Sequence, residues 1–191
     1  GIAISLYGLR SERNWGCGDF TDLRAFSTWV AQDAGADFVA LYPLHSIPNR
    51  QPYNTSPYLP NCSFYRNTLY LDIEAIEDIR QSRTAQTFFA NANARARIQE
   101  LRNAEYVEYE KVYALKLRFL KIAFRNFLKE YREQSERAQR FREYISNEGE
   151  LLDHFALYCA LDETIHKYNR NIWIWPDWPP EFKDVHSPQI A

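Results

Sequence analysis

The stretch of residues 41–67 constrains this chain more than any other; it reads LYPLHSIPNRQPYNTSPYLPNCSFYRN. It is rich in proline, tyrosine and phenylalanine, and it is almost without charge. A loop this long inside a compact domain usually builds a site, unless it is disordered. Disordered segments are poor in aromatic residues. We therefore expect a rigid, aromatic binding loop, better suited to sugar rings than to phosphates or metals.

Bulk composition narrows the class of protein. With 191 residues, the chain can form one large domain or two small ones. A net charge of −2 gives no electrostatic case for a nucleic-acid or membrane partner. The three cysteines are far apart in sequence, which favours neither a disulfide framework nor a zinc site and indicates a reducing, cytoplasmic setting. We see no run long enough to span a membrane and no signal peptide.

The first forty-odd residues predict one βαβ unit. Residues 1–7 (GIAISLY) and 37–44 (DFVALYPL) are short, apolar and β-prone, as buried strands are. Between them, Asp19 or Thr21 can cap a helix over residues 21–34 that Gly35 ends. Strand, helix and strand in this order predict a parallel pair with a right-handed crossover.

The remainder of the chain reads as helical. After the aromatic loop, residues 68–73 suggest a short extended piece and residues 76–79 a helical turn. From Ser82 onward Arg, Ala, Gln and Glu replace Gly and Pro. Apolar residues at helical spacing predict a long helix, and further helices follow before a Trp- and Pro-rich tail. These helices are expected over residues 109–131, 138–146 and 150–167.

Two strands cannot bury both faces of a parallel sheet. Either chain outside this sequence completes the sheet, or the strands pack on the helical part in an unusual way. We favour the first alternative.

The acidic residues are expected to be structural. Asp19 and Asp22 lie at a helix start, where capping explains them. The acidic residues in 72–78 likewise resemble a polar helix start. We therefore assign no catalytic residue within this chain.

His45 follows the second strand, at the rim where α/β proteins place their sites. It could serve a site or make a loop hydrogen bond. The other histidines, His154, His166 and His186, are read as surface or satisfied residues. We find no phosphate loop, nucleophile elbow or metal signature.

The tripeptide Ser56-Pro57-Tyr58 stands out in the loop. Pro57 restricts its own φ and holds Ser56 extended, which directs the Ser56 hydroxyl and the Tyr58 ring. A tyrosine has an apolar face and a polar tip, which match the C–H face and the hydroxyl edge of a sugar. Asn54 supplies a neutral polar group nearby. The alternative is a loop that merely plugs the fold.

Several segments together resemble the amylomaltase family, the 4-alpha-glucanotransferases among the amylase-related glycoside hydrolases. The matching segments follow the family's order and cover most of the chain. They are LYGLRSERNWGCGDFTDL (6–23), GADFVALYPLH (35–45), NTSPYLPNCSFYRN (54–67), LDIEAI (71–76), LLDHFALYCALDE (151–163) and WPDWP (175–179).

This resemblance implies an α/β fold. Residues 1–81 would be an incomplete (β/α)8 TIM-barrel segment carrying the sugar loop, and residues 82–191 a mainly α-helical insertion subdomain. The implied activity is transfer of α-1,4-glucan units between maltooligosaccharides by a retaining double displacement, with no cofactor. The family's catalytic carboxylates belong to later barrel strands, so this chain alone is expected to be inactive.

The resemblance also implies roles for individual residues. Tyr58 would stack on a sugar, Ser56 would hydrogen-bond nearby, and Tyr53 resembles a position for secondary glucan binding. With Asn54 and His45 these are our candidate substrate-binding residues. The loop containing Trp15 is expected to support the first helix.

Two rival interpretations remain open. One is a non-catalytic glucan-binding or interaction module, and the other is a helical scaffold with a βαβ cap. In either, unpaired strand edges would favour self-association. Further βα units encoded beyond residue 191 would discriminate against both.

Overall fold

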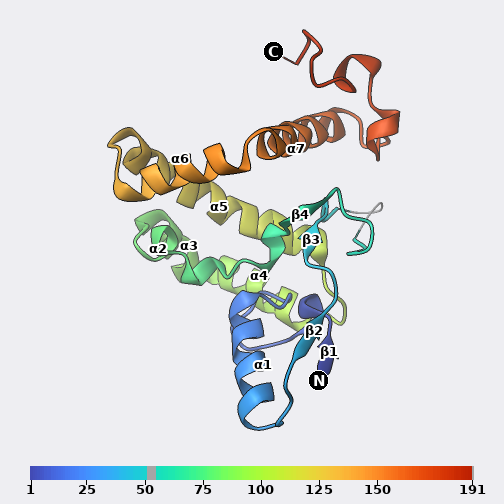
Figure 1. Ribbon diagram of the computed structural model, residues 1–191. Helices are drawn as coiled ribbons and strands as arrows, with labels where there is room; N and C mark the ends of the chain where they lie inside the picture. Colours follow the sequence, from blue (N-terminus) through green and yellow to red (C-terminus); the bar gives the residue numbers. More distant parts are fainter. Residues whose placement is uncertain (51–54, 191) are drawn as a thin grey trace. The chain divides into compact units, whose positions relative to one another are not determined.

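The computed structural model describes residues 1–50 and 55–190 (Figure 1). The chain divides into two compact units, the first over Gly1–Lys129 and the second from Glu130 onward. Each is described by itself. In the described residues, no helix is both long enough and apolar enough to cross a membrane.

The first unit begins with the expected βαβ arrangement. Strand β1 (Ile2–Ile4) pairs in parallel with β2 (Val39–Leu41), with Ile2 opposite Val39, and helix α1 (Phe20–Gln32) connects them. The prediction of a parallel pair is confirmed. Both strands are shorter than expected. Strand β1 ends early because residues Leu6–Gly8 close into a 3-10 turn, η1, in place of extended chain.

The prediction of a loop without secondary structure over residues 41–67 is wrong in part. Strand β3 (His45–Ser46) pairs antiparallel with β4 (Cys62–Arg66), which forms a second two-stranded sheet (Figure 1). Proline and irregular register hid these strands from a periodicity argument. Tyr53 and Asn54, two of the candidate residues, lie outside the described part.

The extended piece expected at residues 68–73 is also wrong. Two 3-10 turns occupy this region, η2 (Thr68–Tyr70) and η3 (Ile73–Ala75). Asn67 caps the first by accepting from Leu69 N at 2.9 Å, and Asp72 caps the second. A capping side chain before each turn offers the backbone an alternative to a strand.

Helices complete the first unit. The expected helical turn is α2 (Glu77–Arg80), and α3 (Arg83–Ala90) and α4 (Ala92–Asn103) follow within the region that reads as helical. The long helix is confirmed as α5 (Tyr109–Arg132). Its Phe119 packs in the core, with Phe89 stacked on it at 4.7 Å and Trp15 edge-on at 5.2 Å between ring centroids.

The second unit holds α6 (Glu136–Glu148), α7 (Glu150–Tyr168) and the 3-10 turns η4 (Trp175–Asp177) and η5 (Pro180–Phe182). The break at Gly149 is confirmed: it adopts φ 59° and ends α6 just before α7 begins. Trp178 is buried and stacks on Tyr158 with ring centroids 5.1 Å apart.

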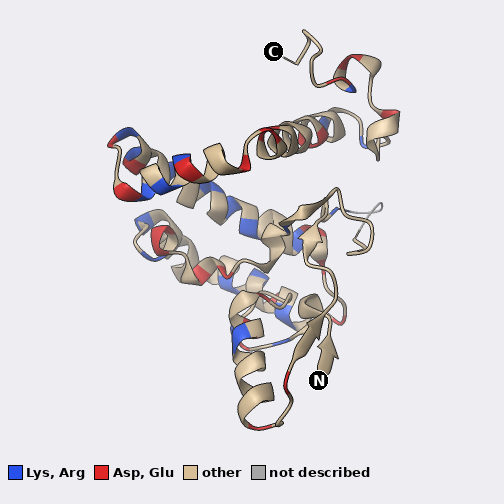
Figure 2. Ribbon diagram, viewed as in Figure 1, with Lys and Arg blue, Asp and Glu red and all other residues tan. Residues whose placement is uncertain are grey.

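Charge is unevenly distributed over the elements. Figure 2 shows blue and red residues along the helices, whereas β1, β2 and the adjoining connections are largely tan. Strands β1 and β2 themselves contain no charged residue.

Candidate functional site

The candidate site is built on the segment that joins β3 to β4, and backbone hydrogen bonds bring the ends of this segment together. Asn61 N donates to Ser46 O at 3.0 Å, and Asn67 N donates to Leu44 O at 2.9 Å. These bonds extend the β3–β4 pairing at both ends, so the segment leaves and re-enters the fold at one place.

Two buried asparagines, Asn49 after β3 and Asn67 after β4, hydrogen-bond to each other and so hold the two ends of this segment together. Asn49 and Asn67 are 2 % and 3 % exposed and exchange two amide hydrogen bonds, of 2.9 and 2.7 Å. Asn49 has φ 53°, a conformation that asparagine tolerates better than most residues. Sequence reasoning missed this pair. An asparagine in the left-handed region is a turn signal, but its distant partner leaves no local trace.

The Ser56-Pro57-Tyr58 tripeptide forms a tight turn above this base. Leu59 N donates to Ser56 O at 3.2 Å, and Tyr58 N donates to Ser56 Oγ at 3.4 Å. The expectation that Pro57 sets the direction of Tyr58 agrees with this turn, since proline suits its second position. The Ser56 hydroxyl accepts a local bond here, so it helps to shape the turn.

Tyr58 points outward and meets a second tyrosine. Its side chain is 64 % exposed, and its ring centroid lies 6.1 Å from that of Tyr42 at an interplanar angle of 57°. Tyr42 is 43 % exposed and directly follows β2, with its backbone N bonded to Ile4 O at 3.1 Å. Sequence reasoning missed Tyr42, although its place after a parallel strand is the usual signal for a site residue.

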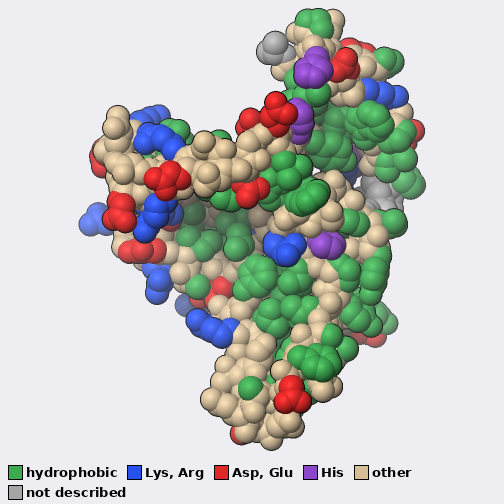
Figure 3. Space-filling model, in the orientation of Figure 1, with side chains coloured by type: hydrophobic (Ala, Val, Ile, Leu, Met, Phe, Trp, Pro, Cys, Tyr) green, Lys and Arg blue, Asp and Glu red, His purple; other side chains and the backbone are tan. Residues whose placement is uncertain are grey.

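The surface around this pair is apolar. Figure 3 shows hydrophobic side chains gathered over the strand region. Leu59 and Phe64 are 66 % and 70 % exposed. Exposed apolar side chains that gather in one region are typical of a binding surface.

His45 lies on β3, opposite Arg66. It is half-buried, and in the described part of the chain its buried Nδ1 atom has no hydrogen-bond partner. Within the described residues, Nδ1 of His45 therefore does not make the loop hydrogen bond that was the alternative to a site role. The structure brings His45 together with Arg66, and Tyr58 with Tyr42.

The acidic residues near the first loop are engaged in structure. Asp19 caps α1: its side chain accepts from Thr21 N and Asp22 N. In turn, Asp22 Oδ2 accepts from Asp19 N, which confirms the capping interpretation. Arg13 Nη2 lies 2.5 Å from Asp19 and 2.8 Å from Asp22, and Arg13 Nη1 lies 2.8 Å from Asp72.

These contacts lower the pKa of Asp22. Burial alone would raise the pKa of Asp22, but hydrogen bonds from Asn14, the Asp19 backbone, Ser11 and Arg13 outweigh it, so the pKa lies below its usual value. A carboxylate held ionised by so many donors is a poor general acid. The cluster supports the first loop, and its Asp22 carboxylate is held in the ionised form.

A buried lysine supports the turns after the aromatic segment. Lys116 is 2 % exposed, and its Nζ donates to Leu69 O at 2.6 Å and to Leu71 O at 2.8 Å. Burial lowers its pKa. A lysine within an apolar helical stripe gave no signal of this role, because its partners are carbonyl groups distant in sequence.

The comparisons with known proteins decide the family. The family model described as 4-alpha-glucanotransferase matches residues 4–191. The chain belongs to the 4-alpha-glucanotransferase family. The resemblance seen in the sequence is thereby confirmed.

Individual 4-alpha-glucanotransferases agree with this assignment. That of Haemophilus influenzae is 35 % identical over 194 residues, covering 98 % of this chain and 27 % of the relative. That of Mycobacterium tuberculosis H37Rv is 32 % identical over 205 residues, covering 100 % of this chain and 25 % of the relative. The chain therefore spans about a quarter of the length of these relatives.

A solved structure of this family shares the fold of most of the chain. It is the amylomaltase from Corynebacterium glutamicum, with a TM-score of 0.70 and 35 % identity over 85 % of this chain and 22 % of that one. Most of this chain is thus similar in fold to part of that amylomaltase.

Proposed function

We propose that these residues act as part of a 4-alpha-glucanotransferase, which transfers α-1,4-glucan units between maltooligosaccharides by a retaining double displacement. Membership of the family supports the reaction class. The observation that carries the role of this chain is the exposed pair of Tyr42 and Tyr58 beyond β2. Its two rings offer a sugar both apolar faces and hydroxyl tips.

The reaction needs two carboxyl groups flanking the bond to be cleaved. Around the first loop, Asp19 and Asp22 cap α1 and pair with Arg13, and Asp72 caps η3 and pairs with Arg13 as well. We infer that the acid and the nucleophile lie elsewhere in the enzyme and that this chain contributes sugar contacts. His45, Ser56, Tyr53 and Asn54 remain proposed contacts beside Tyr58.

We further propose that residues 1–81 open a (β/α)8 barrel and that residues 82–191 form a helical insertion. A barrel would place the residues after β2 at its carboxyl face, where such enzymes bind substrate. A cytoplasmic location, no need of a cofactor and association of the isolated chain through its strand edges are parts of the same proposal.

The test is disproportionation of maltotriose by the 191-residue chain and by the product of the complete reading frame, assayed side by side. We expect glucose and longer maltooligosaccharides from the latter alone. Activity in the 191-residue chain would contradict the assignment of the carboxylates elsewhere. Glucan binding without turnover in both proteins would favour a non-catalytic glucan-binding module.

A further inference from the structure

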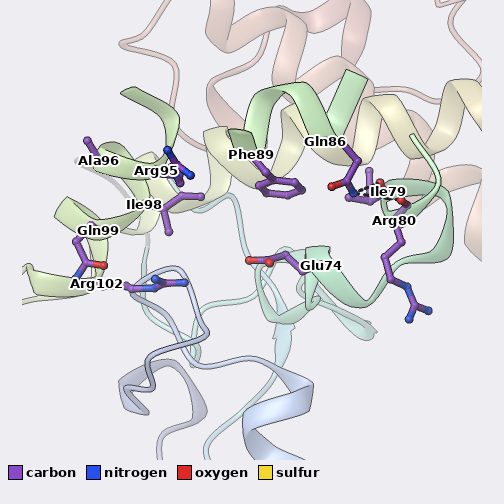
Figure 4. Close-up of a pocket in the computed structure, with 10 residues that line it drawn as sticks. All are labelled: Glu74, Ile79, Arg80, Gln86, Phe89, Arg95, Ala96, Ile98, Gln99 and Arg102. Atoms are coloured by element: carbon purple, nitrogen blue, oxygen red, sulfur yellow. Dashed lines mark hydrogen bonds between the residues drawn. The ribbon is translucent and has the colours of Figure 1, made fainter. Parts of the chain in front are cut away.

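The first unit contains a cavity of about 600 Å³ (Figure 4). It lies between the η3–α2 segment and helices α3 and α4. Polar and apolar side chains both line it. They include one carboxylate and three guanidinium groups beside an aromatic ring and a small side chain: Glu74, Arg80, Arg95, Arg102, Phe89 and Ala96.

An acceptor and a donor face each other across this cavity. Figure 4 shows the Glu74 carboxylate and the Arg102 guanidinium pointing toward one another. Glu74 Oε1 accepts from Trp15 Nε1 at 2.9 Å. Arg102 donates from Nε to Asn14 O at 2.7 Å and from Nη2 to Arg13 O at 2.8 Å. Both groups are held in place before any ligand arrives, which lowers the entropic cost of binding.

An aromatic ring supplies an apolar surface beside these polar groups. Phe89 lines the cavity, and its ring is fixed by stacking on Phe119 with an interplanar angle of 14°. Trp15, which is 3 % exposed, contacts Phe89 edge-on at 6.0 Å. The cavity thus combines a rigid aromatic ring with an anchored acceptor and an anchored donor.

We propose that this cavity binds a hexose ring of an α-glucan at a site separate from the Tyr42–Tyr58 pair. The hydroxyl groups of such a ring both donate and accept, so they can bridge Glu74 and Arg102 while the C–H face packs on Phe89. The choice of glucan as the ligand rests on the proposed function. Charge alone favours an anion, because Arg80, Arg95 and Arg102 outnumber the Glu74 carboxylate in the lining. The choice of a sugar rests on the fixed Phe89 ring and on the paired donor and acceptor, so inorganic phosphate is the competing ligand in the test.

The test uses the complete gene product labelled with 5-fluorotryptophan, because the Trp15 indole binds Glu74 directly. Titration with maltoheptaose is followed through the Trp15 fluorine resonance, which Trp15→Phe assigns. Ala96→Leu places a larger side chain on the cavity wall, and Ala92→Leu makes the same change on α4 at a residue that is not among those lining the cavity. Turnover of maltotriose is measured in parallel.

We expect the Trp15 resonance to shift with maltoheptaose in the unmodified protein and in Ala92→Leu. In Ala96→Leu, half-saturation should need about tenfold more ligand, or the shift should vanish. Glu74→Gln keeps an acceptor for Trp15 but loses the charge, so binding should weaken about three- to tenfold. Maltotriose turnover should be unchanged in all these variants.

Three outcomes would overturn the inference. One is no shift at maltoheptaose concentrations that saturate turnover, and another is an equal shift in Ala96→Leu and Ala92→Leu. The third is a shift caused by inorganic phosphate and removed by salt, which would identify an anion site. If the unmodified complete gene product does not turn over maltotriose, the proposed function is refuted, whether or not the Trp15 fluorine resonance shifts.

Discussion

The rings of Tyr42 and Tyr58 lie with their centroids 6.1 Å apart, although β3 and residues 51–54 separate them along the chain. Tyr42 is directed by the parallel pairing of β2 with β1, and Tyr58 by the turn at Pro57. Both rings are exposed. Two independent local structures thus place the two rings side by side, so a residue of the neutral loop contacts a residue at the end of β2.

Replacing either tyrosine should weaken glucan binding without harming the fold. Tyr58→Ala and Tyr42→Ala are each expected to raise the KM for maltooligosaccharides about tenfold, by removing roughly 1–1.5 kcal/mol of ring contact. The free energy of unfolding should change by less than about 0.5 kcal/mol, because exposed side chains contribute little to it. Steady-state kinetics and urea unfolding check both. Tyr106→Ala, at a 75 % exposed side chain, is the control, and an equal KM change there would argue against the pair.

The buried Asn49–Asn67 pair should be a strong determinant of stability. Asn49→Ala is expected to lower the free energy of unfolding by about 2–4 kcal/mol. It removes both hydrogen bonds to the buried Asn67 amide, and it forces an alanine to adopt a φ of 53°. Asn49→Gly loses the same hydrogen bonds but accepts that φ, so its loss should be about 1 kcal/mol smaller. Urea unfolding of both variants, monitored by tyrosine and tryptophan fluorescence, separates the cost of the lost hydrogen bonds from the cost of the backbone strain. Equal losses would mean that the backbone conformation contributes nothing.

The low pKa of Asp22 predicts how the fold responds to acid. A carboxyl group whose pKa is lower in the folded than in the unfolded state stabilises the fold above its unfolded pKa, near 3.8. This contribution is lost as the pH falls through the lower folded value. Asp22→Asn should therefore cost about 2 kcal/mol at neutral pH and should show a flatter loss of stability below about pH 5.

Urea unfolding at a series of pH values checks this expectation. Asp33→Asn is a suitable control, because Asp33 is exposed at the end of α1. The two acid profiles should differ in slope. If Asp22→Asn kept the full dependence of the unmodified protein, other groups would have to account for the acid transition.

Two glycines with positive φ should differ sharply when changed to alanine. Gly16 has φ 84°, and a Cβ there would meet Leu101 O at 2.1 Å. Gly149 has φ 59° but open space around it. Gly149→Ala is expected to cost about 2 kcal/mol from backbone strain alone, because φ 59° with ψ −144° is a conformation that almost only glycine adopts. Gly16→Ala should cost more than about 3 kcal/mol, since backbone atoms must move.

Thermal unfolding of the two variants makes the comparison. The Gly16 variant should lose its transition or unfold at a far lower temperature than the Gly149 variant. Similar transitions would show that the loop around Gly16 separates from α4 at little cost.

Much of the local structure follows from residue order alone. The βαβ start, the capping of α1 by Asp19, the long helix α5 and the break at Gly149 are all recognisable, because propensity, capping and period are local properties. The family resemblance also rests on contiguous motifs, and the match over residues 4–191 confirms it. The expectation that Pro57 directs the Ser56 hydroxyl and the Tyr58 ring rests on the same kind of argument, since proline acts on its immediate neighbours; the turn itself was not predicted.

Long-range pairings were decided only in three dimensions. The pairing of β3 with β4, the amide exchange of Asn49 with Asn67, and the contact of Lys116 with the carbonyl groups of Leu69 and Leu71 each join distant residues. No local pattern distinguishes such a partner from any other polar group. The free energy of burying a polar group depends on whether its partner is in place, and only the tertiary structure supplies that partner.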